Sequence, residues 1–99
     1  MLNVHKEGQG DELLVRLEGR LDSNTAPLLK DDLISSIEDV HELTLDFDEL
    51  DYVSSAGLSV ILSAQKRMLR QGSMTVKNVN EQIMEVFELT GFADILTIE

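Results

Sequence analysis

The sequence predicts an α/β fold, in which a mixed β-sheet of four to five strands packs against about three helices. Apolar residues alternate with period two in several short segments, as in strands that bury one face. Segments with helical spacing separate all of these strands except the first two, which a turn-forming stretch joins. The expected sheet is therefore an N-terminal hairpin followed by parallel strand–helix–strand units with right-handed crossovers.

The first two strands form the predicted hairpin. Leu2 and Val4 begin the first strand, and residues 8–11, Gly-Gln-Gly-Asp, have the chemistry of a turn. The second strand carries three alternating apolar residues, Leu13, Val15 and Leu17. Residues 19–22, Gly-Arg-Leu-Asp, end it.

The first helix follows a loop with three candidate N-caps, Ser23, Asn24 and Thr25. Pro27 falls in the first helical turn, where proline is tolerated. The expected buried stripe consists of Ala26, Leu29, Leu33 and Ile37.

The third strand is expected to end near Asp48, after the alternating residues Leu43, Leu45 and Phe47. Residues 49–53, Glu-Leu-Asp-Tyr-Val, would then be a short acidic link to the second helix. The expected N-cap of that helix is Ser54 or Ser55.

Five residues of the second helix recur at helical spacing: Leu58, Ile61, Leu62, Gln65 and Leu69. Lys66, Arg67 and Arg70 crowd its end, where the helix dipole favours cations, and Gly72 is expected to form a left-handed C-cap. Gly57 costs stability inside a helix, which leaves two explanations open. Either another backbone approaches it closely, or the turn packs tightly against the neighbouring strand.

The last part of the chain repeats the strand–helix pattern. Its fourth strand is indicated by Met74, Val76 and Val79. Asn80 can cap a third helix that Gly91 closes. The residues of this helix that share a face are Ile83, Val86, Phe87 and Thr90, and a short final strand is indicated by Ile95, Leu96 and Ile98.

Length and composition predict one cytoplasmic domain over residues 1–99. The chain has no cysteine, so neither disulfides nor cysteine-bound metal are expected. No basic-then-apolar leader or stretch of about 20 apolar residues suggests export or membrane insertion. The formal charge of −11 argues against nucleic acid and anionic membranes as partners. It favours a basic protein partner or simple solubility.

The sequence argues against an enzyme. Ser55 follows a strand as in a nucleophile elbow, but that motif needs glycine on both sides, and Val53 replaces the first of them. His41 opens the strand whose far end leads to Ser55, so the two are too distant for a catalytic pair. No glycine-rich phosphate loop or cofactor motif is present, so the chain is not expected to be a kinase.

Several carboxylates surround the expected strand ends: Asp22, Asp46, Asp48, Glu49 and Asp51. They lack the spaced pattern and central glycine of a calcium loop, so solvated acidic loops are the preferred interpretation. Asp22 and Asp51 could also assist a partner's nucleotide-bound magnesium near Ser55.

Parallel pairing places the carboxyl ends of the second and third strands at one edge of the sheet. The loop of Asp22, Ser23 and Asn24 should therefore lie beside the turn at residues 54–57. Partner sites collect at this edge in sheets of this kind. The predicted partner-binding residues are Asp22, Ser23, Asn24, Ser54, Ser55, Ala56, Gly57 and Leu58.

These residues resemble a known family. Ser54-Ser55-Ala56-Gly57-Leu58 after an acidic strand end, with Gly19-Arg20-Leu21-Asp22 earlier, is similar to the anti-sigma factor antagonists, the bacterial members of the STAS domain family. The resemblance covers nearly the whole chain and implies a STAS-like fold. It also implies that a partner, both anti-sigma factor and serine kinase, phosphorylates Ser55 and is thereby released. Ser54 is the alternative site. Sporulation-type members often have aspartate directly before the phosphorylated serine, whereas this chain has a second serine, Ser54, at that position.

The resemblance also implies a phosphoserine phosphatase that resets the protein. Two other functions stay open. STAS domains also serve as non-switching subunits of transport or sensory assemblies, and the same edge could bind a small ligand. The sequence does not decide whether the protein self-associates.

Overall fold

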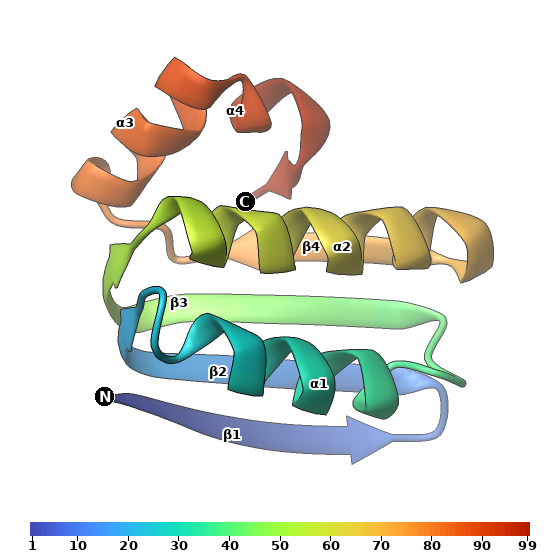
Figure 1. Ribbon diagram of the computed structural model, residues 1–99. Helices are drawn as coiled ribbons and strands as arrows, with labels where there is room; N and C mark the ends of the chain where they lie inside the picture. Colours follow the sequence, from blue (N-terminus) through green and yellow to red (C-terminus); the bar gives the residue numbers. More distant parts are fainter.

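The computed structural model describes residues 1–99 and has one five-stranded sheet in the order β1-β2-β3-β4-β5 (Figure 1). The elements in chain order are β1 (Leu2–Gln9), β2 (Glu12–Leu21), α1 (Ala26–Ser36), β3 (Glu42–Val53), α2 (Ser55–Gln71), β4 (Ser73–Lys77), α3 (Glu81–Thr90), α4 (Phe92–Ile95) and β5 (Thr97–Ile98). β1 and β2 are antiparallel, and all other neighbours are parallel. The predicted mixed α/β fold is confirmed.

The N-terminal hairpin is tighter than the predicted four-residue turn. Gly8 and Gln9 are paired within β1, so only Gly10 and Asp11 form the connection. Gly10 has a φ of 65°, a conformation that glycine adopts without a steric penalty. A two-residue loop of this kind holds the twist of the flanking strands.

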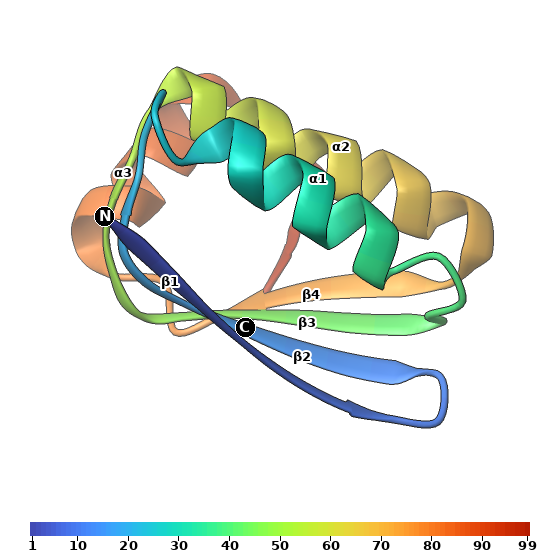
Figure 2. The same ribbon diagram turned by 60° about the horizontal axis from the view of Figure 1, so that its bottom comes forward.

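Helices cover only one face of the sheet. α1 and α2 lie side by side on that face, and the opposite face carries no helix (Figure 2). The alternating residues predicted for β3 point into this single core, and Phe47 is fully buried. Strands and helices contribute aliphatic residues around it, among them Val15, Leu17, Leu43, Leu45, Leu29, Leu33, Ile61 and Met68. None of the helices is long and apolar enough to cross a membrane.

The expected acidic link is wrong, because residues 49–53 belong to β3, which ends only at Val53. β2 pairs with β3 as far as Leu21 and Val53, and its register shifts between Arg16 and Glu18 and again between Gly19 and Arg20. These irregularities interrupt the period-two pattern on which the prediction relied. Leu50 and Val53 are buried at a spacing of three, which sequence alternation alone could not recognise as strand.

The predicted buried face of α2 is wrong at Leu69, whose side chain is 70% exposed. Met68 takes its place and is fully buried. The buried positions Leu58, Ile61 and Gln65 continue to Met68 in steps of three and four, whereas Leu69 lies about 100° further around the helix. The stripe also contains the smaller residues Val60 and Ala64, which the prediction omitted.

The C-terminal third follows the prediction with one addition. Asn80 caps α3, since its Oδ1 accepts from the Ile83 amide at 2.8 Å, and Gly91 ends it in the left-handed conformation. The short helix α4 then precedes β5 and was not predicted. It includes Ile95, which was expected in the last strand, and Val79 similarly lies just beyond β4. A helix of only four residues leaves too little periodicity to be recognised.

Glycine is needed at position 72 because there is no room for a side chain, and not because the backbone forms a left-handed cap. Its φ is 173°, an extended conformation open to any residue, so the expected cap geometry is wrong. A Cβ atom at this position would overlap the carbonyl group of His41. The Ser73 amide donates to the same His41 oxygen at 2.8 Å, which ties the start of β4 to the start of β3.

We expect Gly72→Ala to lower the free energy of unfolding by about 1–3 kcal/mol, because backbone atoms must move to admit the new methyl group. Gly8→Ala is the matched control, since the nearest atom to its added Cβ would be Leu13 Cδ1 at 3.5 Å. The control should change the unfolding free energy by less than about 0.5 kcal/mol. Urea denaturation measures both values. Equal stability of the two variants would contradict the steric explanation.

Candidate functional site

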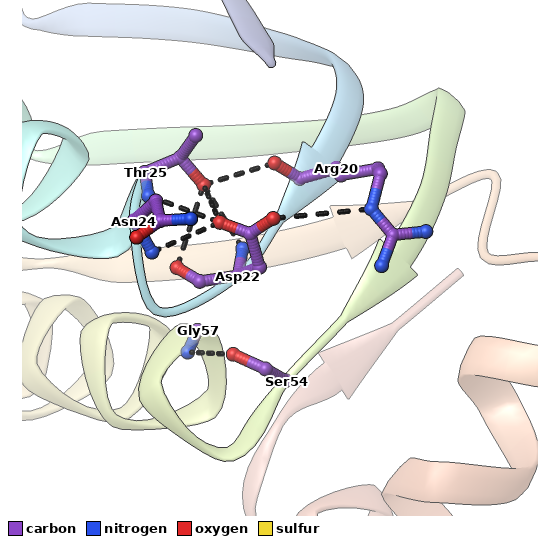
Figure 3. Close-up of polar contacts among 6 residues, drawn as sticks. All are labelled: Arg20, Asp22, Asn24, Thr25, Ser54 and Gly57. Carbon is purple, nitrogen blue, oxygen red and sulfur yellow. Dashed lines mark hydrogen bonds and ion pairs between the residues drawn. The ribbon is translucent and has the colours of Figure 1, made fainter.

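The site is built where β2 and β3 end side by side. Leu21 and Val53 are register partners, and the Ser54 amide donates to the Leu21 carbonyl oxygen at 2.9 Å. This last contact brings the β2–α1 loop against the start of α2, as Figure 3 shows. The predicted adjacency of the Asp22 loop and the Ser54 turn is confirmed. We call residues 20–25 together with 52–56 the rim.

Asp22 organises its own loop. Its Oδ1 accepts from the backbone amides of Asn24 at 3.0 Å and Thr25 at 3.1 Å (Figure 3). Its carbonyl oxygen accepts from the Ala26 amide at 2.8 Å. Thr25 is the N-cap residue of α1 but makes no side-chain capping bond. The expectation that Ser23, Asn24 or Thr25 caps this helix through its side chain is therefore wrong. The Asp22 carboxylate serves the loop amides instead.

These contacts set the ionisation of Asp22. The hydrogen bond from the Thr25 amide, helped by that from Asn24, lowers the pKa of the Asp22 carboxyl despite some desolvation. Asp22 therefore carries its negative charge at neutral pH. The rim has a fixed anionic group beside the start of α2.

Arg20 and Tyr52 extend the rim and were not predicted as site residues. They are register partners at the ends of β2 and β3, and the Arg20 guanidinium lies 4.2 Å from the centroid of the Tyr52 ring. The Nε of Arg20 is 3.8 Å from Asp22 Oδ2 (Figure 3). Only the shifted register brings the two side chains together, so no sequence spacing could have revealed the pair.

Ser54 and Ser55 have different environments. Ser54 is the N-cap of α2, and its Oγ accepts from the Gly57 amide at 3.3 Å (Figure 3). Ser55 is the first residue of the helix, is exposed, and makes no side-chain hydrogen bond within the chain. The open choice between the two N-cap candidates is settled in favour of Ser54.

Gly57 is explained by the strand beneath it. An added Cβ would lie 2.7 Å from Leu21 Cγ and 3.0 Å from the Leu21 carbonyl oxygen, so the turn packs tightly against β2. The contacts fit both explanations left open by the sequence, because the Leu21 oxygen belongs to a closely approaching backbone and Leu21 Cγ to the neighbouring strand. Gly57 and Leu58, which were also predicted as partner-binding residues, are both buried. They support the surface on which Ser55 and the half-buried Ala56 lie.

The acidic residues near the strand ends do not converge on one point. Asp46 is buried on the helix-free face, where its Oδ1 accepts from Asn78 Nδ2 at 2.9 Å and from the Asp48 amide at 3.0 Å. No three side chains among His, Cys, Asp and Glu come together in a metal-binding arrangement. Asp46 therefore holds the β4–α3 loop, whereas Asp22 holds the β2–α1 loop.

The start of α2 can accommodate an anion. The first amides of a helix have no intrahelical acceptor, and the dipole places partial positive charge there. Gly57 already donates to Ser54, which leaves the amides of Ser55 and Ala56. An exposed hydroxyl beside free amides is chemically suited to carry a phosphate group.

Comparison with known proteins identifies the family. The family model described as "STAS domain" matches residues 3–99. The chain belongs to the STAS domain family. Within this family it is similar to proteins named as anti-sigma factor antagonists.

Two curated STAS proteins show the level of similarity. The anti-sigma-B factor antagonist of Bacillus subtilis is 29% identical over 98 residues, which is 98% of this chain and 90% of that protein. The anti-sigma-B factor antagonist of Listeria monocytogenes is 30% identical over 96 residues, covering 95% and 84% of the two chains.

Solved structures share the STAS fold. A crystal structure of an anti-sigma factor antagonist from Mycobacterium paratuberculosis has a TM-score of 0.89 at 18% identity, covering 99% of this chain and 85% of that one. The antagonist SpoIIAA matches in its unphosphorylated form with a TM-score of 0.77, at 17% identity and 98% and 87% coverage. The phosphorylated form of the Bacillus protein SpoIIAA has a TM-score of 0.76, at 18% identity and 98% and 91% coverage.

The different roles of the two serines predict different stabilities for their alanine variants. Ser54→Ala removes the cap of α2 and should lower the unfolding free energy by about 1 kcal/mol. Ser55→Ala removes an exposed hydroxyl without a partner and should change it by less than about 0.5 kcal/mol. Chemical denaturation of both variants tests this. A larger loss for Ser55→Ala than for Ser54→Ala would reverse the assignment.

Proposed function

We propose that this STAS domain is an anti-sigma factor antagonist that binds an anti-sigma factor with serine kinase activity and thereby frees a sigma factor. Phosphorylation of Ser55 by that partner turns the antagonist off. The observation that carries the proposal is the exposure of the Ser55 hydroxyl while the Ser54 hydroxyl is engaged in the helix cap. A kinase can reach Ser55 without first breaking the cap.

The surroundings of Ser55 suit the approach of a partner. Ala56 and the buried Gly57 present no large side chain next to the hydroxyl. The Asp22 loop lies directly beside the turn, so a partner over Ser55 would also meet Asp22, Ser23 and Asn24. These residues are the proposed docking surface.

Phosphorylation should act on binding and leave the fold intact. A phosphate at Ser55 would sit at the start of α2, where amides and the helix dipole favour negative charge. The two forms of SpoIIAA match this chain with nearly the same TM-score, which agrees with a fold that persists. The added charge of about −1.5 to −2 would instead face the partner close to ionised Asp22.

The expected effect on affinity is large. A charge left without a partner in an interface costs on the order of 2–5 kcal/mol, which is tens- to thousands-fold in affinity. This is enough to separate a bound from a released state. Resetting the switch requires a phosphoserine phosphatase, and we place the whole cycle in the cytoplasm, where the anti-sigma partner would act.

Incubation with ATP and the co-purified kinase should add one phosphate to Ser55, as measured by peptide mass spectrometry. Ser55→Ala should abolish this modification and retain partner binding. Ser55→Asp should weaken binding at least about tenfold with an unchanged melting temperature, because it adds negative charge only at the interface.

Ser73→Ala serves as the control in these assays, since Ser73 is an exposed hydroxyl at the start of β4, at the other end of the sheet from the rim. It should be phosphorylated at Ser55 like the unaltered protein. Modification of Ser54, or of neither serine, would refute the assignment. Stable capture of a membrane permease or transport ATPase, with no kinase, would favour the non-switching STAS role.

Asp22 is expected to act at the interface through its charge. Asp22→Asn keeps an oxygen that can accept from the amides of Asn24 and Thr25, so the loop should stay folded. The loss of charge should lower partner affinity or phosphorylation rate about tenfold. Calorimetric titration and a phosphate-incorporation time course measure the two quantities.

Asp39→Asn is the matched control for Asp22→Asn, because Asp39 is an exposed carboxylate between α1 and β3, away from the rim. It should leave both quantities unchanged. If Asp22→Asn also left both unchanged, Asp22 would have no part in docking or in phosphoryl transfer.

A further inference from the structure

A groove made of two neighbouring hollows lies between α1 and α2 on the helix-covered side. Its first section, next to the rim, is a cavity of about 390 Å³ lined by Ala26, Pro27, Lys30, Ala56, Ser59 and Val60. Its second section, of about 250 Å³, is lined by Ile34, Ser63, Lys66, Arg67 and Arg70. The two sections are neighbours along both helices. Lys30 and Ile34 on α1 are four residues apart, as are Ser59 and Ser63 on α2, and in each pair the first residue lines the first section and the second residue lines the second. We call the two sections together the interhelical groove.

The interhelical groove contains most of the Lys and Arg side chains that have no carboxylate partner. Three of the eight Lys and Arg side chains form ion pairs, in the pairs Lys6–Asp32, Arg16–Glu7 and Arg20–Asp22. Of the other five, four line the groove: Lys30, Lys66, Arg67 and Arg70. In a chain with 19 acidic residues, these four cations lie together along one surface feature.

Helix-end electrostatics explain only part of this arrangement. Arg70 is the one basic residue in the last turn of α2, where the dipole favours cations. Lys66 and Arg67 lie earlier in the helix, and Lys30 belongs to α1. Arg67 uses its Nε to donate to Gln71 at 3.3 Å, which leaves its two terminal nitrogens available. A further reason is needed for four unpaired cations along one groove.

The groove also changes character along its length. The section near Ser55 is lined by small and apolar side chains with Lys30 at its side, whereas the distant section carries three cations and Ile34. From Ala56 to Arg70 the helix rises about 21 Å, which an extended peptide of about six or seven residues would span. Apolar contact at one end and ion pairing at the other define a direction for such a ligand.

We infer that the interhelical groove binds an acidic segment of a protein partner, with apolar residues at the rim end and carboxylates beside Lys66, Arg67 and Arg70. This inference deepens the proposed function, because it assigns the segment to the same partner that docks over Ser55. One partner can reach both places, since Ala56 borders the groove and follows Ser55 directly. Opposite charge would orient the segment before the rim contacts form.

The charge pattern favours a short acidic segment over nucleic acid or an anionic membrane. A long phosphate chain leaving the rim end of the groove would meet the ionised Asp22, and one crossing α1 would meet exposed Asp31. The rest of the protein would repel it, because the formal charge of the whole chain is −11. A segment confined to the groove avoids these carboxylates.

The test uses a synthetic ten-residue peptide with leucines in one half and glutamates in the other, titrated into ¹⁵N-labelled protein and followed by amide NMR shifts. The expected shifts cluster at Ala56, Ser59, Ser63, Arg67 and Arg70. They should weaken with added salt, since the screening length falls from about 10 Å at 0.1 M to about 3 Å at 1 M. A peptide with lysine in place of glutamate should not bind.

The double variant Lys66→Gln with Arg70→Gln should weaken peptide binding about tenfold, as expected when two ion pairs are lost. Lys77→Gln is the matched control, because Lys77 also lacks a carboxylate within ion-pair distance but lies on β4 outside the groove. It should bind the peptide like the unaltered protein. Ser55→Ala should also bind normally, so failure of the phosphorylation assay and failure of the groove assay are separate results.

Three outcomes would overturn the inference. The first is no binding of the acidic peptide up to a concentration of about 1 mM. The second is an equal loss of binding in Lys77→Gln and in the double variant. The third is stronger perturbation of the same amides by single-stranded DNA or by phosphatidylglycerol vesicles than by the peptide, which would assign the groove to phosphate-bearing ligands.

Discussion

The parallel pairing of β2 with β3 up to Leu21 and Val53 is the contact on which the rest of the site depends. It persists through two register shifts and continues into the bond from the Ser54 amide to the Leu21 oxygen. The two crossover helices consequently begin side by side. Gly57 is part of the same constraint, because only a residue without a side chain lets α2 start this close to β2.

The polar groups at the rim divide the structural tasks among themselves. Ser54 caps α2, and the Asp22 carboxylate accepts hydrogen bonds from the amides of Asn24 and Thr25 in the β2–α1 loop. Ser55 is left exposed on a firmly held turn. A phosphate placed there would meet a fixed environment, so its effect would pass to a binding partner and not to the fold of the domain.

The charges of this small acidic protein are separated by location. The negative charge of Asp22 lies at the rim, and the four unpaired cations line the interhelical groove, which begins beside the rim. A partner would therefore meet opposite fields within one contiguous surface. Such a pattern specifies the orientation of docking more than it adds to affinity, because exposed charges are screened by salt.

The sequence by itself determined the α/β class, the hairpin, the order of the main elements and the closeness of the two loops, since periodicity and crossover handedness are local or general rules. It also placed Ser55 at a helix start. Only the tertiary structure showed that residues 49–53 are strand, that Met68 replaces Leu69 in the core, and that Arg20 stacks on Tyr52. The physical reason is that a bulged register and the burial of a side chain depend on contacts with neighbouring strands and helices. The local sequence of one segment does not contain that information.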